Sequence, residues 1–172
     1  SPSVLRTNTE RGLELALRAI TSIAQRSRLV GKEALDVLSV AARAIAHPPM
    51  STPANASEKK ELELSSNEEV VIAGVQAIRA VLEAWTEATA LECEVWASDQ
   101  GQACVGFLLA ALLRTAKEST ALGSEVREEA MLAVISVFEA ARGSRRAVGF
   151  FMPGIISGMA RVAVEAGSKG TK

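Results

Sequence analysis

The feature that most limits the fold of this chain is the spacing of its apolar residues, which recur at helical intervals along almost the whole length. Near the N-terminal end, apolar residues recur at a spacing that places them on one face of a helix: Leu13, Ala16, Leu17, Ile20, Ile23 and Ala24. Similar faces recur to about residue 166, and no strand pattern separates them. The sequence therefore predicts an all-α fold.

The helical segments group into three antiparallel pairs, over residues 9–47, 67–119 and 124–166. Two stacked helices in a unit of about 40 residues are typical of HEAT and armadillo repeats. An ordinary six-helix bundle is the alternative. The run from Ala103 to Leu113 favours the repeat fold, because it is apolar except at Gly106 and predicts a helix with several neighbours. We expect a single α-solenoid domain over residues 1–172.

Several boundaries can be predicted within these pairs. Residues 48–66 contain three prolines and a charged run, so we expect a flexible linker there, with a docking or phosphorylation segment as the alternative. Asn67 is expected to cap the helix that follows, and Ser124 to cap the next-to-last helix. Residues 86–98 either end a helix or form a short turn. Pro153 is expected to break or restart the last helix.

Composition argues against several classes of function. The net charge is −1, and the chain has no Tyr, four Phe and two Trp, so it lacks both the basic surplus and the aromatic platforms typical of nucleic-acid binders. The two cysteines and the single histidine, His47, are too few for a zinc site built from those residues. We expect Cys93 and Cys104 to be buried free thiols rather than a disulfide.

The sequence offers no catalytic constellation. A serine or cysteine nucleophile would need His47 as its base, and that residue precedes two prolines at a helix end. The phosphate-binding loop, the dinucleotide fingerprint and the Glu-x-x-His pair of di-iron bundles are all missing. We therefore expect no enzymatic activity, no catalytic residue, no metal and no cofactor.

The longest apolar stretch, from Ala147 to Val164, is about as long as a membrane span. Pro153, Ser157 and Arg161 interrupt it, so we expect a buried helix of a soluble protein instead. The aromatic pair at positions 150 and 151 is expected in the core, and an exposed partner anchor is the alternative.

Three arginines, Arg142, Arg145 and Arg146, lie together at the predicted turn between the last two helices. They could bind an acidic or phosphorylated segment of a partner, because the guanidinium fork matches carboxylate and phosphate geometry. The favoured interpretation is structural: positive charge at a helix C-terminus complements the helix dipole.

Three stretches in the last third of the chain carry a resemblance to a known family. They are an apolar run over 106–113, the segment 126–131, and the segment 150–162 with its Phe-x-Pro-Gly-Ile-x-Ser pattern. Together they resemble the N-terminal HEAT region of the Tel-two-interacting protein one family. The resemblance covers residues 104–172 and extends more weakly to 67–85. It implies a structural role for Phe151, Pro153 and Gly154. The family often has a longer insertion near Arg142 to Arg146 than this chain does.

The resemblance implies a function as well. The family works with Tel-two and a second Tel-two-interacting protein as the Triple T complex. With Hsp90 and its co-chaperones, this complex supports the folding and assembly of PI3K-related kinases of the TOR, ATM, ATR and DNA-PK type. The implied role is a non-enzymatic scaffold, cytoplasmic or also nuclear, with protein partners and with no nucleic acid or membrane.

Two other classes of function stay open. A different HEAT or armadillo adaptor, for transport or the cytoskeleton, would use the same helices, and a transport factor would bind a Ran-type GTPase or a basic cargo peptide. A small enzyme or ligand-binding bundle would need an enclosed pocket with converging polar groups.

Overall fold

A computed structural model describes the backbone of residues 8–46, 56–117 and 122–168, and the side chains of 10–46, 68–117 and 122–168. Every regular element in these ranges is helical, as the sequence predicts. The long helices are α1 (Asn8–Arg26), α2 (Gly31–Ala46), α3 (Ala56–Glu83), α5 (Asp99–Ala116), α6 (Ser124–Ala141) and α7 (Arg145–Ser168). A short helix α4 (Ala90–Cys93) and a 3-10 helix η1 (Glu94–Ala97) lie between α3 and α5.

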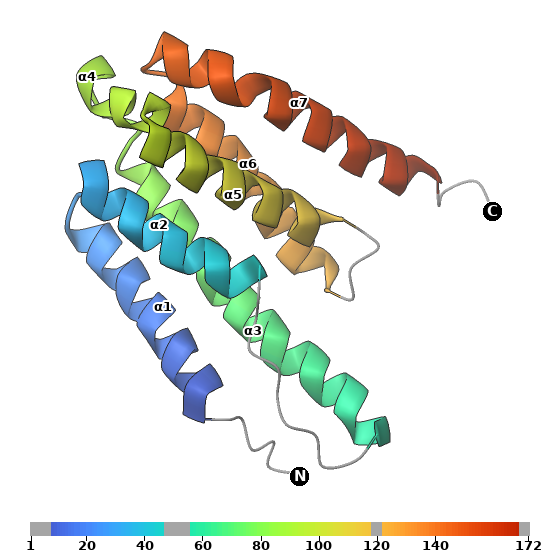
Figure 1. Cartoon of the computed structure of the whole chain (residues 1–172). Helices are drawn as coiled ribbons and strands as arrows, with labels where there is room; N and C mark the ends of the chain where they lie inside the picture. Colours follow the sequence, from blue (N-terminus) through green and yellow to red (C-terminus); the bar gives the residue numbers. More distant parts are fainter. Residues whose placement is uncertain (1–7, 47–55, 118–121, 169–172) are drawn as a thin grey trace.

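The long helices form two layers (Figure 1). α1, α3 and α6 lie side by side and run the same way, while α2, α5 and α7 form the second layer and run the opposite way. The chain therefore alternates between layers at each long helix. This arrangement is consistent with an all-α helical-repeat fragment, in which each pair of helices stacks on the next.

The closest packing lies between successive pairs rather than inside each pair. α1 packs mainly on α3 and touches α2 only slightly, while α2 packs against both α3 and α5. α5 in turn rests on α6. The hydrophobic core is thus continuous along the stack. The three predicted helix pairs share this core instead of each forming one of their own.

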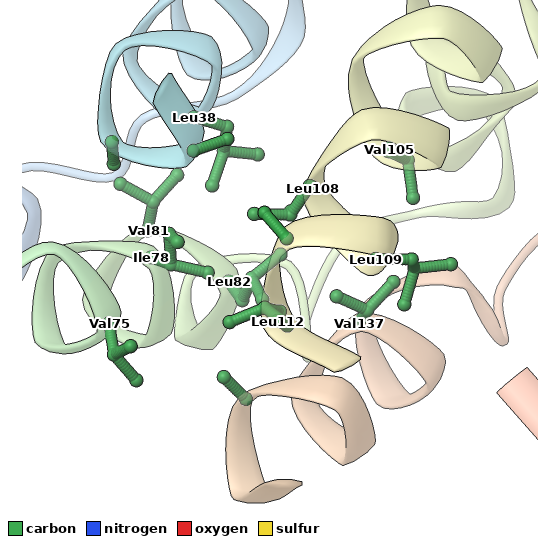
Figure 2. Close-up of a cluster of buried hydrophobic side chains, with 14 of the residues drawn as sticks. Leu38, Val75, Ile78, Val81, Leu82, Val105, Leu108, Leu109, Leu112 and Val137 are labelled. Carbon is green, nitrogen blue, oxygen red and sulfur yellow. The ribbon is translucent and has the colours of Figure 1, made fainter. Parts of the chain in front are cut away.

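The core is centred on α3 and α5 (Figure 2). Ile78 and Leu82 from α3 meet Leu108 and Leu112 from α5, and all four side chains are buried. Leu38 of α2 and Val137 of α6 extend this cluster toward both neighbours, as Figure 2 shows. Burying an aliphatic side chain contributes about 1.5–3 kcal/mol, so this junction holds the layers together.

Gly74 explains how closely α2 and α3 approach. A Cβ atom at this position would lie 2.5 Å from Ile45 Cγ2 and 3.5 Å from the carbonyl oxygen of Ala41. Real Cβ atoms do not come so near another carbon, so the α2–α3 crossing depends on a residue without a side chain.

The predicted linker is wrong over residues 56–66, because α3 already begins at Ala56. These residues are mostly Glu, Lys, Leu and Ser, and no proline or glycine occurs between Pro53 and Gly74. Glu, Lys and Leu are good helix formers, so α3 runs through Asn67, which is not its N-cap. Residues 48–55 lie outside the described part of the chain.

Two other boundary predictions also differ from the structure. Gly123 rather than Ser124 is the N-cap of α6, with extended φ and ψ of −63° and 160°. Its amide donates to Glu68 Oε1 of α3 at 2.8 Å, so a neighbouring helix supplies the carboxylate that caps this end. Pro153 lies inside α7, which continues past it to Ser168.

Residues 86–98 form a compact junction with Trp96 at its centre. Trp96 lies edge-to-face against Trp85 in the turn that follows α3, with ring centroids 4.9 Å apart, and both rings are buried. The sequence left open whether this segment ends a helix or forms a separate turn. The structure shows α4 and η1, two short elements that carry Trp96 into the core.

Candidate interaction surface

The three arginines lie at the α6–α7 turn, as predicted, and all three are exposed. Arg142 is the C-cap residue of α6 and pairs with Glu139, at 2.8 Å between Nη1 and Oε2. Arg145 and Arg146 open α7. Buried Ser144 shapes the turn, because its hydroxyl accepts from the Ala147 amide at 3.1 Å and donates to Glu94 Oε1 at 2.8 Å.

The interpretation that these arginines complement a helix dipole applies to only one of the three. Arg142 lies at a helix C-terminus, where positive charge complements the dipole. Arg145 and Arg146 occupy the first turn of a helix, where the dipole is positive and like charge is unfavourable. Their placement therefore contributes no dipole stabilisation, and it gathers positive charge at an exposed turn that an acidic segment could approach.

The Phe-x-Pro-Gly motif divides between the core and the surface. Phe151 is buried, while Pro153 and Gly154 are exposed on α7. Phe150 contacts Phe151 edge-to-face at 5.0 Å, yet it is 49% exposed, so the prediction that both aromatics are core is wrong for Phe150. The two rings are consecutive in a helix and therefore point about 100° apart, so only one of them can face the core.

The expectation that residues 147–164 form a buried helix is wrong. Within α7 only Ala147, Phe151 and Ile155 are buried, and the large side chains of Phe150, Ile156 and Val164 are largely exposed. α7 contacts α5, α6 and η1, and a Cβ at Gly158 would overlap Leu113 of α5. Of the helices described here, α7 is the one whose length and composition would allow it to cross a membrane.

Open grooves mark the surface of the described residues. One, of about 470 Å³, lies where α6 faces the C-terminal half of α7 and is lined by Met131, Leu132, Val162 and Ala166 among others. Another, of about 430 Å³, runs across α1, α3 and α6 and is polar. Arg79 crosses this second groove to Glu129 at 2.6 Å, so an ion pair joins α3 to α6 there.

Both cysteines are free and buried, as predicted. The Cys93 thiol donates to the carbonyl oxygen of Ala140 at 3.4 Å. Cys104 accepts from the Ser39 hydroxyl at 3.3 Å and donates to the Leu35 carbonyl at 3.4 Å. Burial is the main cause that raises the pKa of each thiol, which keeps both protonated and poorly nucleophilic at neutral pH.

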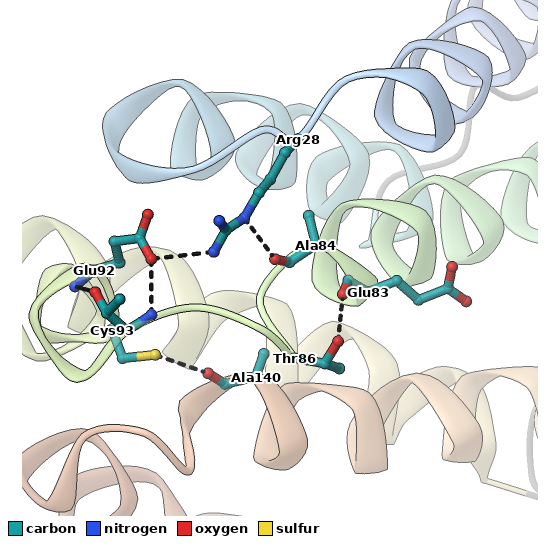
Figure 3. Close-up of polar contacts among 8 residues, drawn as sticks. Arg28, Glu83, Ala84, Thr86, Glu92, Cys93 and Ala140 are labelled. Carbon is teal, nitrogen blue, oxygen red and sulfur yellow. Dashed lines mark hydrogen bonds and ion pairs between the residues drawn. The ribbon is translucent and has the colours of Figure 1, made fainter.

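Sequence reasoning missed a polar cluster that ties two turns together (Figure 3). Arg28, in the turn after α1, donates to the Ala84 carbonyl oxygen at 3.1 Å and to Glu92 Oε2 at 3.1 Å. Glu92 also accepts from the Thr89 amide at 2.7 Å, which completes a capping box at the start of α4. The Thr-x-x-Glu spacing of residues 89–92 is the signal that would have revealed it.

This cluster lowers the pKa of Glu92. The hydrogen bond from the Thr89 amide is the largest cause. Desolvation acts in the opposite direction, and the positive charge of Arg28 lowers the pKa further. Both partners favour the ionised carboxylate.

His47 lies outside the described residues. Among the residues that are described, no three His, Cys, Asp or Glu side chains come together in a group that could hold a metal ion.

We compared the chain with family models, curated proteins and solved structures, and none of them matches it.

Proposed function

We propose that the chain is a helical-repeat scaffold that acts by protein–protein contact within the Triple T co-chaperone complex, in support of PI3K-related kinases. The observation that carries the proposal is the resemblance of residues 104–172 to the Tel-two-interacting protein one family, centred on the Phe-x-Pro-Gly-Ile-x-Ser pattern. The proposed partners are Tel-two, the second Tel-two-interacting protein, the kinases, and Hsp90 with its co-chaperones. The proposed location is the cytoplasm, with a nuclear pool.

The two-layer stack supports this role. Stacked helix pairs present long continuous faces, and such faces suit contact with other proteins. Exposed Arg145 and Arg146, next to the exposed ring of Phe150, provide charge and an aromatic anchor at one turn. Arginine and aromatic residues are enriched at the centres of protein interfaces.

The test is capture from cells of the protein that contains this chain, followed by identification of what co-purifies. We expect Tel-two and PI3K-related kinases. The double variant Arg145→Glu with Arg146→Glu should recover at least several-fold less Tel-two if the α6–α7 turn is in the interface. Arg43→Glu, an exposed arginine change on α2, serves as the matched control and should recover as much as the wild type.

Recovery of neither Tel-two nor a kinase would contradict the proposal. The alternative function is a different helical-repeat adaptor, for transport or the cytoskeleton, and the same experiment tests it. A Ran-type GTPase or a protein with a basic cargo peptide among the captured proteins would favour a transport adaptor instead.

A further inference from the structure

The stack has two ends, with α1 and α2 at one and α6 and α7 at the other (Figure 1). The helices at both ends expose large apolar side chains. At one end, α1 exposes Leu15 (67%) and Ile23 (53%), with the small residues Ala16 and Ala19 exposed between them. At the other end, α6 exposes Leu132 and Ile135, each at 44%. We call these the α1 face (Leu15, Ala16, Ala19, Ile23) and the α6 face (Leu132, Ile135). Branched aliphatic side chains repeated on one helix face are typical of helix–helix contact.

A helix docked on either face would pack in the same way as neighbouring helices already pack within this layer. α1 packs on α3, and α3 packs on α6, with all three helices running the same way. A further parallel helix beside α6 would therefore repeat the packing seen twice in this layer. α1 of another copy has the matching direction and nearly the same length, 19 residues against 18 for α6.

The charged residues at the ends of the two faces are complementary: the α1 face is flanked by arginines and the α6 face by glutamates. Exposed Arg11 and Arg26 bracket the α1 face and lie about 22 Å apart along the helix axis. Glu125 and Glu139 bracket the α6 face and lie about 21 Å apart. In a parallel arrangement Arg11 therefore reaches Glu125 while Arg26 reaches Glu139, which already pairs with Arg142.

The second layer shows the same complementarity. α2 carries the exposed Glu33 in its first turn, and α7 carries Arg145 and Arg146 in its first turn. α2 and α7 run the same way, so a copy stacked on this end would bring acid to base in this layer also.

We propose that the α1–α2 end of one copy docks onto the α6–α7 end of a second copy, so that the chain associates head to tail. A two-fold symmetric dimer through either face is disfavoured. It would set each helix beside its own copy, so that like charges meet. Arg11 would lie near Arg26 of the partner copy if the helices ran antiparallel, or near Arg11 of the partner copy if they ran parallel, and the same holds for Glu125 and Glu139. Because a head-to-tail contact leaves one face open at each end, it grows into longer assemblies. The association does not depend on the co-chaperone role proposed above.

Sedimentation velocity over a range of concentrations tests this inference. The average mass of the wild type should rise with concentration beyond that of a dimer, from a monomer of 18.1 kDa. Leu15→Glu with Ile23→Glu disrupts only the α1 face, and Leu132→Lys with Ile135→Lys only the α6 face. Each variant alone should stay monomeric, and an equimolar mixture should stop at the dimer, because each variant contributes its one intact face.

Charge reversal at the flanking residues provides a second, independent test of the head-to-tail contact. Arg11→Glu with Arg26→Glu, and Glu125→Arg with Glu139→Arg, should each weaken association at least ten-fold, and mixing the two variants should restore it. Leu91→Glu, a change at an 84% exposed residue of α4, is the control and should associate like the wild type. Helical circular dichroism and thermal melting confirm that each variant is folded.

Three results would overturn the proposal. The first is a wild type that stays monomeric at every concentration. The second is a face variant that still forms dimers on its own, which would show a two-fold contact. The third is a monomeric wild type that co-sediments with phosphatidylserine-containing vesicles, and that stops doing so when Phe150 and Ile156 on α7 are changed to Ser, which would assign the exposed apolar end to a lipid surface.

Discussion

The Glu92 carboxylate joins the start of α4 to the turn after α1. It accepts from the Thr89 amide and pairs with Arg28, and Arg28 in turn donates to the Ala84 carbonyl. The turn after α1 is thereby fastened to the turn after α3. The effect of this cluster on stability depends on the charge of Glu92 and therefore on pH.

We expect Glu92→Gln to lower the melting temperature at neutral pH and to lower it less at pH 3, where more of the carboxylate is protonated. The folded-state pKa of Glu92 is lowered, so its ionised form stabilises the fold above the unfolded pKa near 4.5. That contribution is lost as pH falls through the folded pKa. Thermal melts at both pH values measure the difference between variant and wild type.

The matched control is Glu87→Gln, a change at an exposed glutamate of the same turn region. It should leave the melting temperature nearly unchanged at neutral pH. If Glu92→Gln destabilised the protein equally at pH 7 and pH 3, the ionised carboxylate would not be the source of the effect.

Single residues differ in how well the sequence predicts them. Burial of Cys93 and Cys104 is predictable, because a free cysteine behaves as a small apolar residue and is among the most buried residue types. Exposure of Phe150 is not, because spacing alone cannot say which of two adjacent aromatics faces the core. Arg28 lies far from Glu92 in sequence, and only the folded stack brings the two together.

Among the elements, α7 combines unusual features. It contains Pro153, which cannot donate to the carbonyl of Gly149, and most of its apolar surface is exposed. α7 also lies at the edge of the stack, where one side of the helix has no layer neighbour among the described residues.

Pro153→Ala should stabilise α7, by up to about 3 kcal/mol, because alanine restores the backbone hydrogen bond and fits an exposed helical position. Amide hydrogen exchange within 149–157 should slow correspondingly. Gly154→Ala, at a site with no atom near the added Cβ, provides a reference change of about 1 kcal/mol. Faster exchange in Pro153→Ala would show that the proline is required for the path of α7.

The tryptophan pair stabilises the segment of residues 86–98 that connects α3 to α5. Trp96→Ala should lower the free energy of unfolding by about 3–5 kcal/mol, because it removes a buried ring that packs edge-to-face on Trp85. Urea denaturation followed by circular dichroism measures this loss. Leu91→Ala, a few residues away and 84% exposed, should cost less than about 0.5 kcal/mol. Equal losses would mean that the junction contributes little to the core.

Helix identity was predictable here, and helix ends were less so. The predicted pairs over 9–47 and 124–166 begin and end close to the observed outer ends of α1–α2 and α6–α7. The start of α3 was missed because residues 56–66 have no apolar face, although their helix propensity is high. The N-terminal cap of α6 was missed because Glu68, from another helix, supplies the carboxylate.

At the scale of the whole molecule, two layers of helices give a shape with two distinct ends. The length of the helix pairs, about 40 residues each, predicted that the chain alternates between two layers. It did not predict that the helices pack mainly against the neighbouring pair rather than within their own pair. The core between pairs arises because α3 and α5 each contact the pair on either side. For the same reason the outermost helices expose apolar surface, because a neighbour covers only one side of them.

The two ends also separate the proposed function from the proposed self-association. Self-association uses both ends at once, whereas a co-chaperone subunit could bind at the α6–α7 turn alone. The α1-face variant, Leu15→Glu with Ile23→Glu, should therefore lose self-association and still recover Tel-two from cells.

The most direct measurement of the central claim is binding of the purified chain to purified Tel-two, using the α1-face variant so that self-association does not interfere. The account predicts a saturable complex that weakens at least ten-fold when Arg145→Glu and Arg146→Glu are added. A complex that forms equally well with those arginines reversed would place the contact away from the α6–α7 turn. No complex at any concentration tested would contradict the co-chaperone assignment itself.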